Sequence, residues 1–529
     1  MRDRTAVAII IAIWLLSTIL WLQPGITRPD GVGYYVYLPS AYIGHDLLFF
    51  DEWQRFGLVP GGRILHKEIT TTNHLGDHWT CGSAVWWLPS FILGDALRLL
   101  FHQFPRDGIS LPYNVAVVVA SAVAGLGVLL IGWWMSRSLL AVLGIWFGSP
   151  LLWYSLRNSI TSHAVSAFAC ALLVFLAVRL RDRTDWQAFF SVGLAAGFAA
   201  AVRPQNLSLA VIPFFFSFRK SWIYLAGILL GLLPELVVSQ FIYGDPTAFF
   251  FGGTARPFAA FERIWIWEPL FSWYHGLFTW TPFLALGVVG FAFLIRDDRR
   301  LGLAAVYAFA SQWFINAAFE RSFWGAYSFG QRRFDNCLLF FLLGAAALFR
   351  RIPRWLAVAL TVMTAGWTMS LYFAALDGLN LSSYYTPAEL FRLAEFKVPL
   401  PLESVPAPMH GVVLAMAVVC VASWALACVL IRRFAMIAGA SVVAIASILF
   451  LAAGLNDRTH LPRFRSLIDH NRPYQLLPGG PDVRFGLLSD EATYLRKSGR
   501  IAEADKTERE LIDLQRARRA AAARMGIQE

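Results

Sequence analysis

The sequence is poor in charge and in cysteine, and each shortage excludes a class of protein. Only 15% of its 529 residues are charged, whereas soluble domains carry about 25%. A chain with so little charge cannot cover several soluble domains with polar surface. The five cysteines are scattered and form no C-x-x-C pair, which excludes a disulfide framework and a cysteine zinc site.

Hydrophobic residues dominate the chain instead. They make up 57% of it, with 43 Phe and 21 Trp, and the mean hydropathy is +0.55. Most of such a chain must face lipid or other helices embedded in lipid. The composition therefore predicts an all-α polytopic membrane protein.

The formal net charge of +11 does not indicate nucleic-acid binding. The basic residues occur in short clusters between apolar runs, as on the cytoplasmic side of a membrane protein, and no continuous basic face is formed. We therefore expect the lipid bilayer of the inner (plasma) membrane as a partner and no nucleic acid.

The apolar runs predict about thirteen membrane spans, judged over ~20-residue windows. The first, Ala6–Leu22, lacks a small-residue cleavage site and is expected to remain in the protein. Pro89, Asp95 and Arg98 interrupt the stretch 83–101, which we interpret as an interfacial or re-entrant helix. The other spans are expected at 113–135, 137–155, 160–180, 187–203, 205–218, 221–243, 276–295, 302–319, 334–349, 354–375, 411–431 and 434–455.

This count places the basic clusters, such as Arg179–Arg183 and Arg296–Arg300, on the cytoplasmic side with the N-terminus. Residues 1–455 then form the membrane domain, and residues 24–112 form a large outer loop. Residues 456–529 form an extracytoplasmic C-terminal tail that is helical toward its end. Leu495–Ala504 resembles one helix-turn-helix unit of a tetratricopeptide repeat.

Asp30 follows the first span by a few residues and stands beside Gly31, Gly33, Tyr34 and Tyr35. One interpretation is an Asp-Gly turn that caps an interfacial helix. The other is a carboxylate held at the lipid–water boundary as a general base. In that case we expect partial burial to raise its pKa and the glycines to leave room for substrate.

The segment Asp30–Asp46 resembles the first outer loop of the GT-C glycosyltransferases, among them protein O-mannosyltransferases and the lipid A aminoarabinose transferase. Asp30 matches the first acid of that loop, Tyr34 and Tyr35 fall near its aromatic residue, and Asp46 falls near its later acid. Gly31 replaces the second acid of the pair.

Other parts of the chain resemble the same group. The span count, the long first loop and the outer tail are similar to its architecture. The segments 162–164, 201–206 and 328–334 resemble motifs of uncharacterised bacterial members. The Lys-Pro-Pro stretch of the relatives is missing, and a segment with Asp77 and His78 occupies that region.

The resemblance implies inverting transfer of a hexosyl or pentosyl group from a polyprenyl-phosphate donor to an acceptor at the outer face. Asp30 would be the catalytic base, on the side of the sugar opposite the departing phosphate. We expect the remaining candidates to bind substrate: Tyr34, Tyr35, Asp46, Asp77, His78, His163, Arg203, Arg256, Arg332 and Arg333.

The four arginines of this set lie on the side that is normally poor in basic residues. A guanidinium binds two phosphate oxygens at once, so at least two of the four are expected to contact the donor phosphate. The alternative is that they snorkel, or pair with Glu262, Glu320 or Asp335.

A metal or other cofactor is not favoured. The outer histidines, and Lys67 beside His66, show no His-x-x-x-His or Glu-x-x-His spacing. A divalent metal is therefore conceivable, but the spacing does not indicate one. The histidines are His66, His74, His78 and His163. Five outer tryptophans are expected to form an interfacial belt, with some stacking on sugar: Trp265, Trp267, Trp273, Trp280 and Trp324.

Two other functions remain open. A transporter or lipid-linked sugar flippase would need an acid inside the membrane, for which Glu235 is the candidate. A lipid-linked glycan polymerase or ligase would use a pyrophosphate-linked chain. The sequence specifies neither the sugar nor the acceptor, which could be a glycan, a lipid or a protein.

Overall fold

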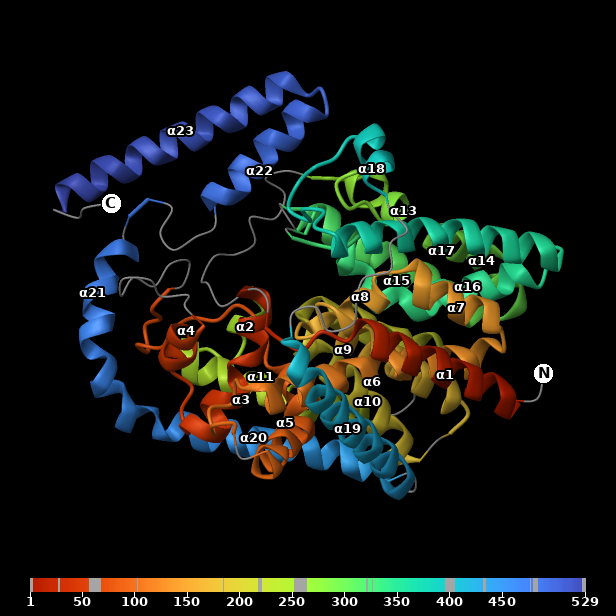
Figure 1. The fold of residues 1–529 in the computed structure, drawn as a ribbon, viewed down its shortest axis with the longest axis horizontal. Coiled ribbons are helices and arrows are strands. Elements are labelled where there is room, and N and C mark those ends of the chain that lie inside the picture. Colours follow the sequence, from red (N-terminus) through yellow and green to blue (C-terminus); the bar gives the residue numbers. More distant parts are fainter. Residues whose placement is uncertain are drawn as a thin grey trace.

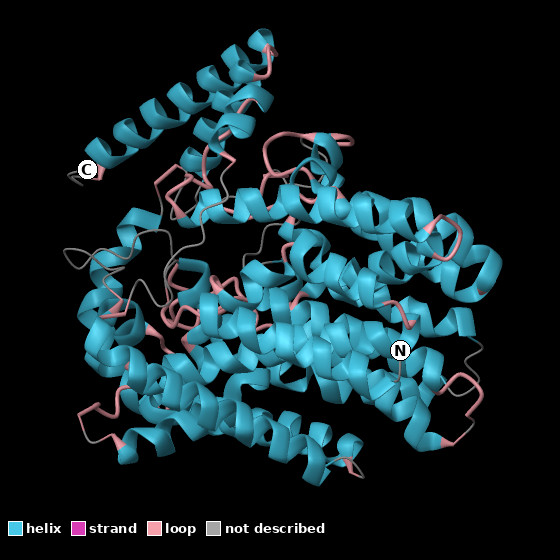
Figure 2. Ribbon diagram, turned by 45° about the vertical axis from the view of Figure 1, so that its right-hand side comes forward, coloured by secondary structure: helices cyan, strands magenta, loops and turns pink. Residues whose placement is uncertain are grey.

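The computed structural model describes residues 3–26, 29–56, 68–101, 103–183, 185–216, 221–251, 264–319, 322–325, 327–394, 405–431, 434–475, 477–478 and 484–525. Every regular element within these ranges is helical (Figure 2), and one isolated bridge joins Ile69 and Leu75. The all-helical prediction is confirmed.

Eight helices of the described residues are long and apolar enough to cross a membrane. These helices make the chain a multi-pass membrane protein. They are α1 (Asp3–Trp21), α6 (Leu111–Ser136), α9 (Ser162–Arg179), α11 (Ser221–Tyr243), α15 (Arg299–Ala318), α17 (Arg354–Leu376), α19 (His410–Ile431) and α20 (Ala435–His460).

Other expected spans are shorter or broken. The span expected at 137–155 divides into α7 (Leu139–Gly148) and α8 (Leu151–Leu156) at Pro150, and the span at 276–295 divides into α13 (Leu277–Trp280) and α14 (Phe283–Asp297) at Pro282. Proline interrupts a helix because it lacks the backbone N–H. The remaining three are the 17-residue α10 (Trp186–Val202), the 3₁₀ helix η3 (Pro204–Phe216), and the 3₁₀ helix η5 (Arg332–Cys337) followed by α16 (Leu338–Phe349). The count of thirteen spans stays a prediction.

Helices α10 and α11 pack closely through two glycine pairs, each spaced by four residues. A Cβ atom on Gly193 or on Gly197 would lie 2.1 Å from a backbone carbonyl oxygen of α11. Gly231 of α11 is as crowded, since its Cβ would lie 2.6 Å from the Leu194 carbonyl oxygen. Small residues at this spacing let membrane helices approach backbone to backbone. This contact fixes α10, whose C-terminal end carries Arg203.

The expected interfacial helix is a continuous helix, α5 (Gly82–Leu100), with Pro89 inside it. It packs along α6 and also meets α9, α10 and α20. Its depth in a membrane stays a prediction.

The first outer loop carries short helices that gather at the end of α1 opposite the N-terminus (Figure 1). They are α2 (Pro29–Tyr35), α3 (Tyr37–Pro39), the π-helix η1 (Ser40–Gly44) and α4 (Phe50–Arg55). Short elements in later loops are η4 (Ala248–Phe251), α12 (Glu268–Phe271), α18 (Pro387–Leu393) and η6 (Ala407–Met409).

Helix α20 continues to His460, past the expected span end, and leads into η7 (Leu461–Phe464) and α21 (Arg465–Gln475). The chain ends in a hairpin of α22 (Arg484–Lys497) and α23 (Ile501–Arg524), seen at the top of Figure 1. The turn contains Gly499 with φ +82°, a conformation that favours glycine.

The hairpin docks on the loops through an aromatic cluster. Tyr494 packs against Trp265 and Phe323, and the Arg500 guanidinium lies 5.3 Å from the Trp265 ring centre. Arg500 also pairs with Glu268 at 3.1 Å. The tail therefore lies at the same end of the bundle as these loops.

Three of the five tryptophans expected in the belt are packing residues. Trp265, Trp280 and Trp324 are buried inside the protein and cannot face headgroups or sugar, whereas Trp267 is 61% exposed. The hydropathy pattern could not distinguish these cases, because aromatic loops fold on one another here.

Candidate active site

Asp30 and Arg332 form an ion pair between the first outer loop and the start of η5. Arg332 Nη2 donates to Asp30 Oδ2 at 2.9 Å. The Asp30 side chain is 34% exposed and the Arg332 side chain 13% exposed. Thus two of the sequence-predicted residues meet, with the carboxylate on the more accessible side.

The two glycines after Asp30 serve packing. A Cβ on Gly31 would lie 2.9 Å from the Ile160 carbonyl oxygen, and one on Gly33 would lie 2.0 Å from the Trp79 ring. The expectation that they leave room for substrate was wrong, because Trp79 and the backbone at Ile160 fill that space. Gly31 instead lets α2 press against the loop that precedes α9, and Gly33 lets it press against Trp79, before α5.

The pKa of Asp30 also differs from expectation. Burial raises it, but the Arg332 guanidinium, with smaller effects from His78 and Arg333, outweighs burial and holds the pKa below its ordinary value. The predicted increase was therefore wrong, since the sequence did not show that a cation would pair with this carboxylate. Asp30 is an anion at neutral pH.

A second ionic group involves Arg203, His163 and Asp335. His163 Nδ1 lies 2.6 Å from Asp335 Oδ2, and Arg203 Nη1 donates to the same oxygen at 3.2 Å. Ser166 donates to the other carboxylate oxygen, Oδ1, at 3.1 Å. Of the alternatives for the arginines, pairing with Asp335 holds for Arg203.

The 3₁₀ helix η5 directs its polar side chains to different partners. A 3₁₀ helix has three residues per turn, so Arg332 and Asp335 project from one side. Arg332 reaches Asp30, and Asp335 reaches Arg203 and His163. Arg333 turns elsewhere and donates to the Ser322 carbonyl oxygen at 2.6 Å. Two consecutive arginines thus have separate roles.

Beneath these ion pairs lies a buried amide network that the sequence analysis did not identify. Asn336 donates to Asn206 at 2.9 Å and to Gln312 at 2.8 Å, and Gln205 donates to Gln312 at 3.0 Å. Asn206 donates in turn to Ser166 at 3.0 Å, which connects the network to Asp335. Gln312 inside the apolar helix α15 was the available signal, because polar residues within membrane helices face partners.

Tyr34 and His78 lie next to the Asp30–Arg332 pair. Burial raises the pKa of Tyr34, whose hydroxyl lies near Ser162 and within electrostatic reach of Arg203, Asp30 and Arg332. His78 acts electrostatically on Asp30 and packs against Trp79 in a tilted arrangement, with ring centres 3.8 Å apart. Both side chains therefore border the carboxylate.

Two other candidates, Tyr35 and Asp77, contact other parts of the protein. The Tyr35 hydroxyl donates to the Gly108 carbonyl oxygen at 2.7 Å, and its ring packs edge-on against Phe91. The Asp77 carboxylate accepts from the Trp79 N–H at 3.2 Å, and its own N–H donates to the Tyr243 hydroxyl at 2.7 Å. These contacts hold the first loop against the helices.

Asp46 belongs to a different cluster, at the end of α20. His460 Nδ1 lies 2.9 Å from Asp46 Oδ2, and Ser40 donates to Asp46 Oδ1 at 3.0 Å. Nearby, His74 Nε2 lies 2.8 Å from Asp457 Oδ2. The structure thus connects Asp46 and His74 to the C-terminal part of the chain and not to Asp30.

Arg256 lies outside the described residues, as do His66, Lys67, Glu262 and Glu320. Within the described part of the chain, no group of three or more His, Cys, Asp or Glu side chains could hold a metal ion. The described site contains one accessible carboxylate, two arginines and a His–Asp pair.

No protein-family model matches the sequence, and no curated protein matches it. Among solved structures, the chain is similar to ArnT from Cupriavidus metallidurans, crystallised with undecaprenyl phosphate bound. The similarity covers 90% of this chain and 80% of that one, with 14% sequence identity and a TM-score of 0.39.

Proposed function

We propose that the protein transfers a sugar from a polyprenyl-phosphate donor to an acceptor at the outer face of the membrane in which it lies, with inversion at the anomeric carbon. The observation that carries this proposal is the Asp30–Arg332 ion pair beside Arg203 and His163. It brings a partly exposed carboxylate into contact with the Arg332 guanidinium, and His163 connects this pair to the Arg203 guanidinium. The reaction needs those two kinds of group.

The carboxylate of Asp30 removes the proton of the acceptor nucleophile as that atom bonds to the anomeric carbon. The bond from the anomeric carbon to the donor phosphate oxygen breaks, and the phosphate leaves as an anion. Cations must stabilise the growing charge on that oxygen. We assign this role to Arg332 and Arg203, which pair with Asp30 and Asp335 in the free protein.

The ion pair gives the donor a way to activate the base. In the free enzyme Arg332 lowers the pKa of Asp30 and makes it a weak base. A donor phosphate competes for the same guanidinium. When it binds, Arg332 lowers the pKa of Asp30 less, and the effect of burial, which raises that pKa, is no longer outweighed. The pKa of Asp30 then rises, and the carboxylate becomes a stronger base while the sugar is in place.

The transporter alternative receives no support from Glu235. Its carboxylate accepts the Cys81 N–H at 2.7 Å and the Ser239 hydroxyl at 3.3 Å, which anchors the start of α5. A polymerase or ligase would use the same carboxylate and cations with a pyrophosphate-linked donor, so the donor itself must be tested.

The deciding experiment supplies the detergent-purified protein with a polyprenyl-phosphate sugar labelled in the sugar, together with a membrane extract as acceptor source. Transfer requires that the label become covalently attached to a new molecule, with release of polyprenyl phosphate. Proteoliposomes in which labelled donor crosses the bilayer without forming a new bond would contradict the proposal and support a flippase. A parallel reaction with a polyprenyl-pyrophosphate sugar tests the polymerase or ligase alternative.

A further inference from the structure

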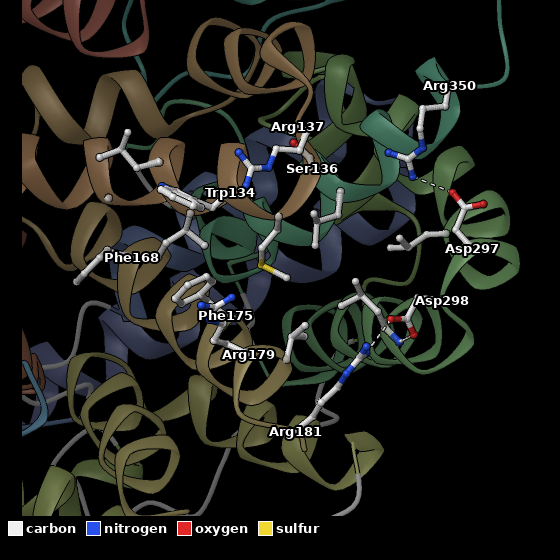
Figure 3. Close-up of a pocket in the computed structure, with 18 residues that line it drawn as sticks. Trp134, Ser136, Arg137, Phe168, Phe175, Arg179, Arg181, Asp297, Asp298 and Arg350 are labelled. Carbon is white, nitrogen blue, oxygen red and sulfur yellow. Dashed lines mark hydrogen bonds and ion pairs between the residues drawn. The ribbon is translucent and has the colours of Figure 1, made fainter. Parts of the chain in front are cut away.

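A cavity of about 820 Å³ lies at the opposite end of the bundle from Asp30 and Arg332. Figure 3 shows the residues that line it. Helix α9 connects the two regions: His163 is near its start, and Arg179 is its last residue. At a rise of 1.5 Å per residue, the two are roughly 24 Å apart along the axis. The cavity is therefore separate from the candidate active site, at the end that the basic clusters predict to be cytoplasmic.

The inner wall of the cavity is apolar. Leu130, Ile131 and Trp134 come from α6, and Phe168 and Phe175 come from α9. Both helices are candidate membrane spans, and Trp134 is 56% exposed. An apolar wall on two membrane spans is accessible to the acyl chains of the bilayer.

The rim of the cavity carries an excess of positive charge. Four arginines and two aspartates line it. Arg181 pairs with Asp298 at 3.2 Å and Arg350 pairs with Asp297 at 2.8 Å, as the dashed lines in Figure 3 show. These pairs neutralise both aspartates that line the cavity. The excess positive charge of the lining residues therefore lies on Arg137 and Arg179.

Neither of those two arginines pairs with a buried carboxylate among the described residues. Arg179 is exposed and has no ion pair with any residue that the structure describes. Arg137 pairs with Asp3, whose side chain is 65% exposed, and its guanidinium lies 4.9 Å from the Trp134 ring centre.

The backbone at Arg137 supports a role for its side chain. It ends α6 with φ 55° and ψ 22°, a left-handed conformation that normally selects glycine or asparagine. An arginine at this position places its guanidinium over Trp134, at the junction of the polar rim and the apolar wall.

We propose that this cavity binds an anionic membrane phospholipid, with the phosphodiester on Arg137 and Arg179 and an acyl chain along the wall of α6 and α9. Guanidinium groups bind phosphate oxygens in pairs, and basic pockets between membrane helices suit anionic head groups. The cavity volume falls within the range of about 300–1,000 Å³ usual for ligand sites.

The test titrates the full-length protein with palmitoyl-oleoyl phosphatidylglycerol or phosphatidylcholine and counts bound lipids by native mass spectrometry. The protein should bind phosphatidylglycerol at least about tenfold more tightly than phosphatidylcholine. Both lipids carry the phosphodiester, but the choline ammonium neutralises phosphatidylcholine and is repelled by the two arginines. The double variant Arg137→Gln/Arg179→Gln should lose that preference. The matched control Arg299→Gln/Arg354→Gln removes two exposed arginines from the same end, outside the cavity, and should change binding by less than about twofold.

A second variant keeps every charge and places a larger side chain on the apolar wall of the cavity. Leu130→Trp should weaken phosphatidylglycerol binding, and inorganic phosphate alone should not displace the lipid. Equal binding by the double variant and the wild type would overturn the proposal, as would an equal loss in the control pair. Full displacement by inorganic phosphate, with no effect of Leu130→Trp, would show an anion site that holds no lipid chain and would also overturn it.

Discussion

Asp30 and Arg332 are 302 positions apart in the chain and are joined by an ion pair of 2.9 Å. One residue lies in the first outer loop and the other begins the 3₁₀ helix before α16. This contact brings the proposed base to the proposed phosphate-binding cations.

Replacing Arg332 should affect use of the donor more than folding. Arg332→Ala should raise the donor KM by roughly ten- to hundredfold, as expected for a lost charge-assisted contact of about 1.5–3 kcal/mol. Arg332→Lys should lose less, because it keeps the charge and loses the fork geometry. Initial rates over a range of donor concentrations give both values. An unchanged donor KM in the alanine variant would remove Arg332 from the donor site.

The same alanine variant should shift the pH dependence of kcat/KM for the donor. Asp30 acts as a carboxylate, so the rate falls as the pH drops through its pKa. Arg332 holds that pKa below the ordinary value of 3.8 against the opposing effect of burial. Without Arg332, burial should move the acidic limb of the profile to higher pH. A shift to lower pH, or none, would contradict the pairing.

Asp335 should be important for stability. Asp335→Ala leaves the Arg203 guanidinium without its carboxylate in a largely buried position, and such a loss costs about 3–5 kcal/mol. The apparent Tm in detergent should fall clearly. As a control, Asp505→Ala breaks an ion pair with Arg496 on the exposed tail hairpin and should leave the Tm nearly unchanged. Equal shifts in the two variants would mean that the buried network does not stabilise the fold.

The topology predicts that the tail and the active site face the same compartment. Tyr494 packs on Phe323, in the same loop as Ser322, which binds Arg333. A cysteine at exposed Ser498, in a background without Cys428, should react with a membrane-impermeant maleimide on intact cells. Labelling that requires cell lysis would place the tail in the cytoplasm and reverse the predicted orientation.

The sequence predicted the parts of the site that follow simple rules. Helical spans follow from apolar runs, and Asp30, Arg203 and Arg332 stood out as charges at span ends. It offered Asp335 as one of three possible partners for the four arginines. It could not assign Arg203 to Asp335 or Arg332 to Asp30, because these contacts join distant segments. The partner of Asp46 could not be predicted for the same reason, since His460 lies 414 positions away.

The buried amides were missed for a related reason. Gln312, Asn206 and Asn336 are single polar residues whose local sequence indicates no partner. The contacts among these amides depend on the break at Pro204 and on the 3₁₀ turns that follow α10 and precede α16. Hydropathy treats those segments as continuous spans, so the broken geometry that exposes polar groups to one another is lost.

The most direct test of the central claim is the turnover of Asp30→Asn with a labelled polyprenyl-phosphate sugar. Asparagine keeps the shape of the side chain and removes its basicity, so turnover should fall by about 10²–10⁴-fold. Donor binding should persist, because Arg332 and Arg203 remain. Asp505→Asn, which alters an exposed Asp–Arg pair on the tail, should retain full turnover. Near-normal transfer by Asp30→Asn, with transfer abolished in Asp46→Asn or Asp77→Asn, would show that another carboxylate is the base.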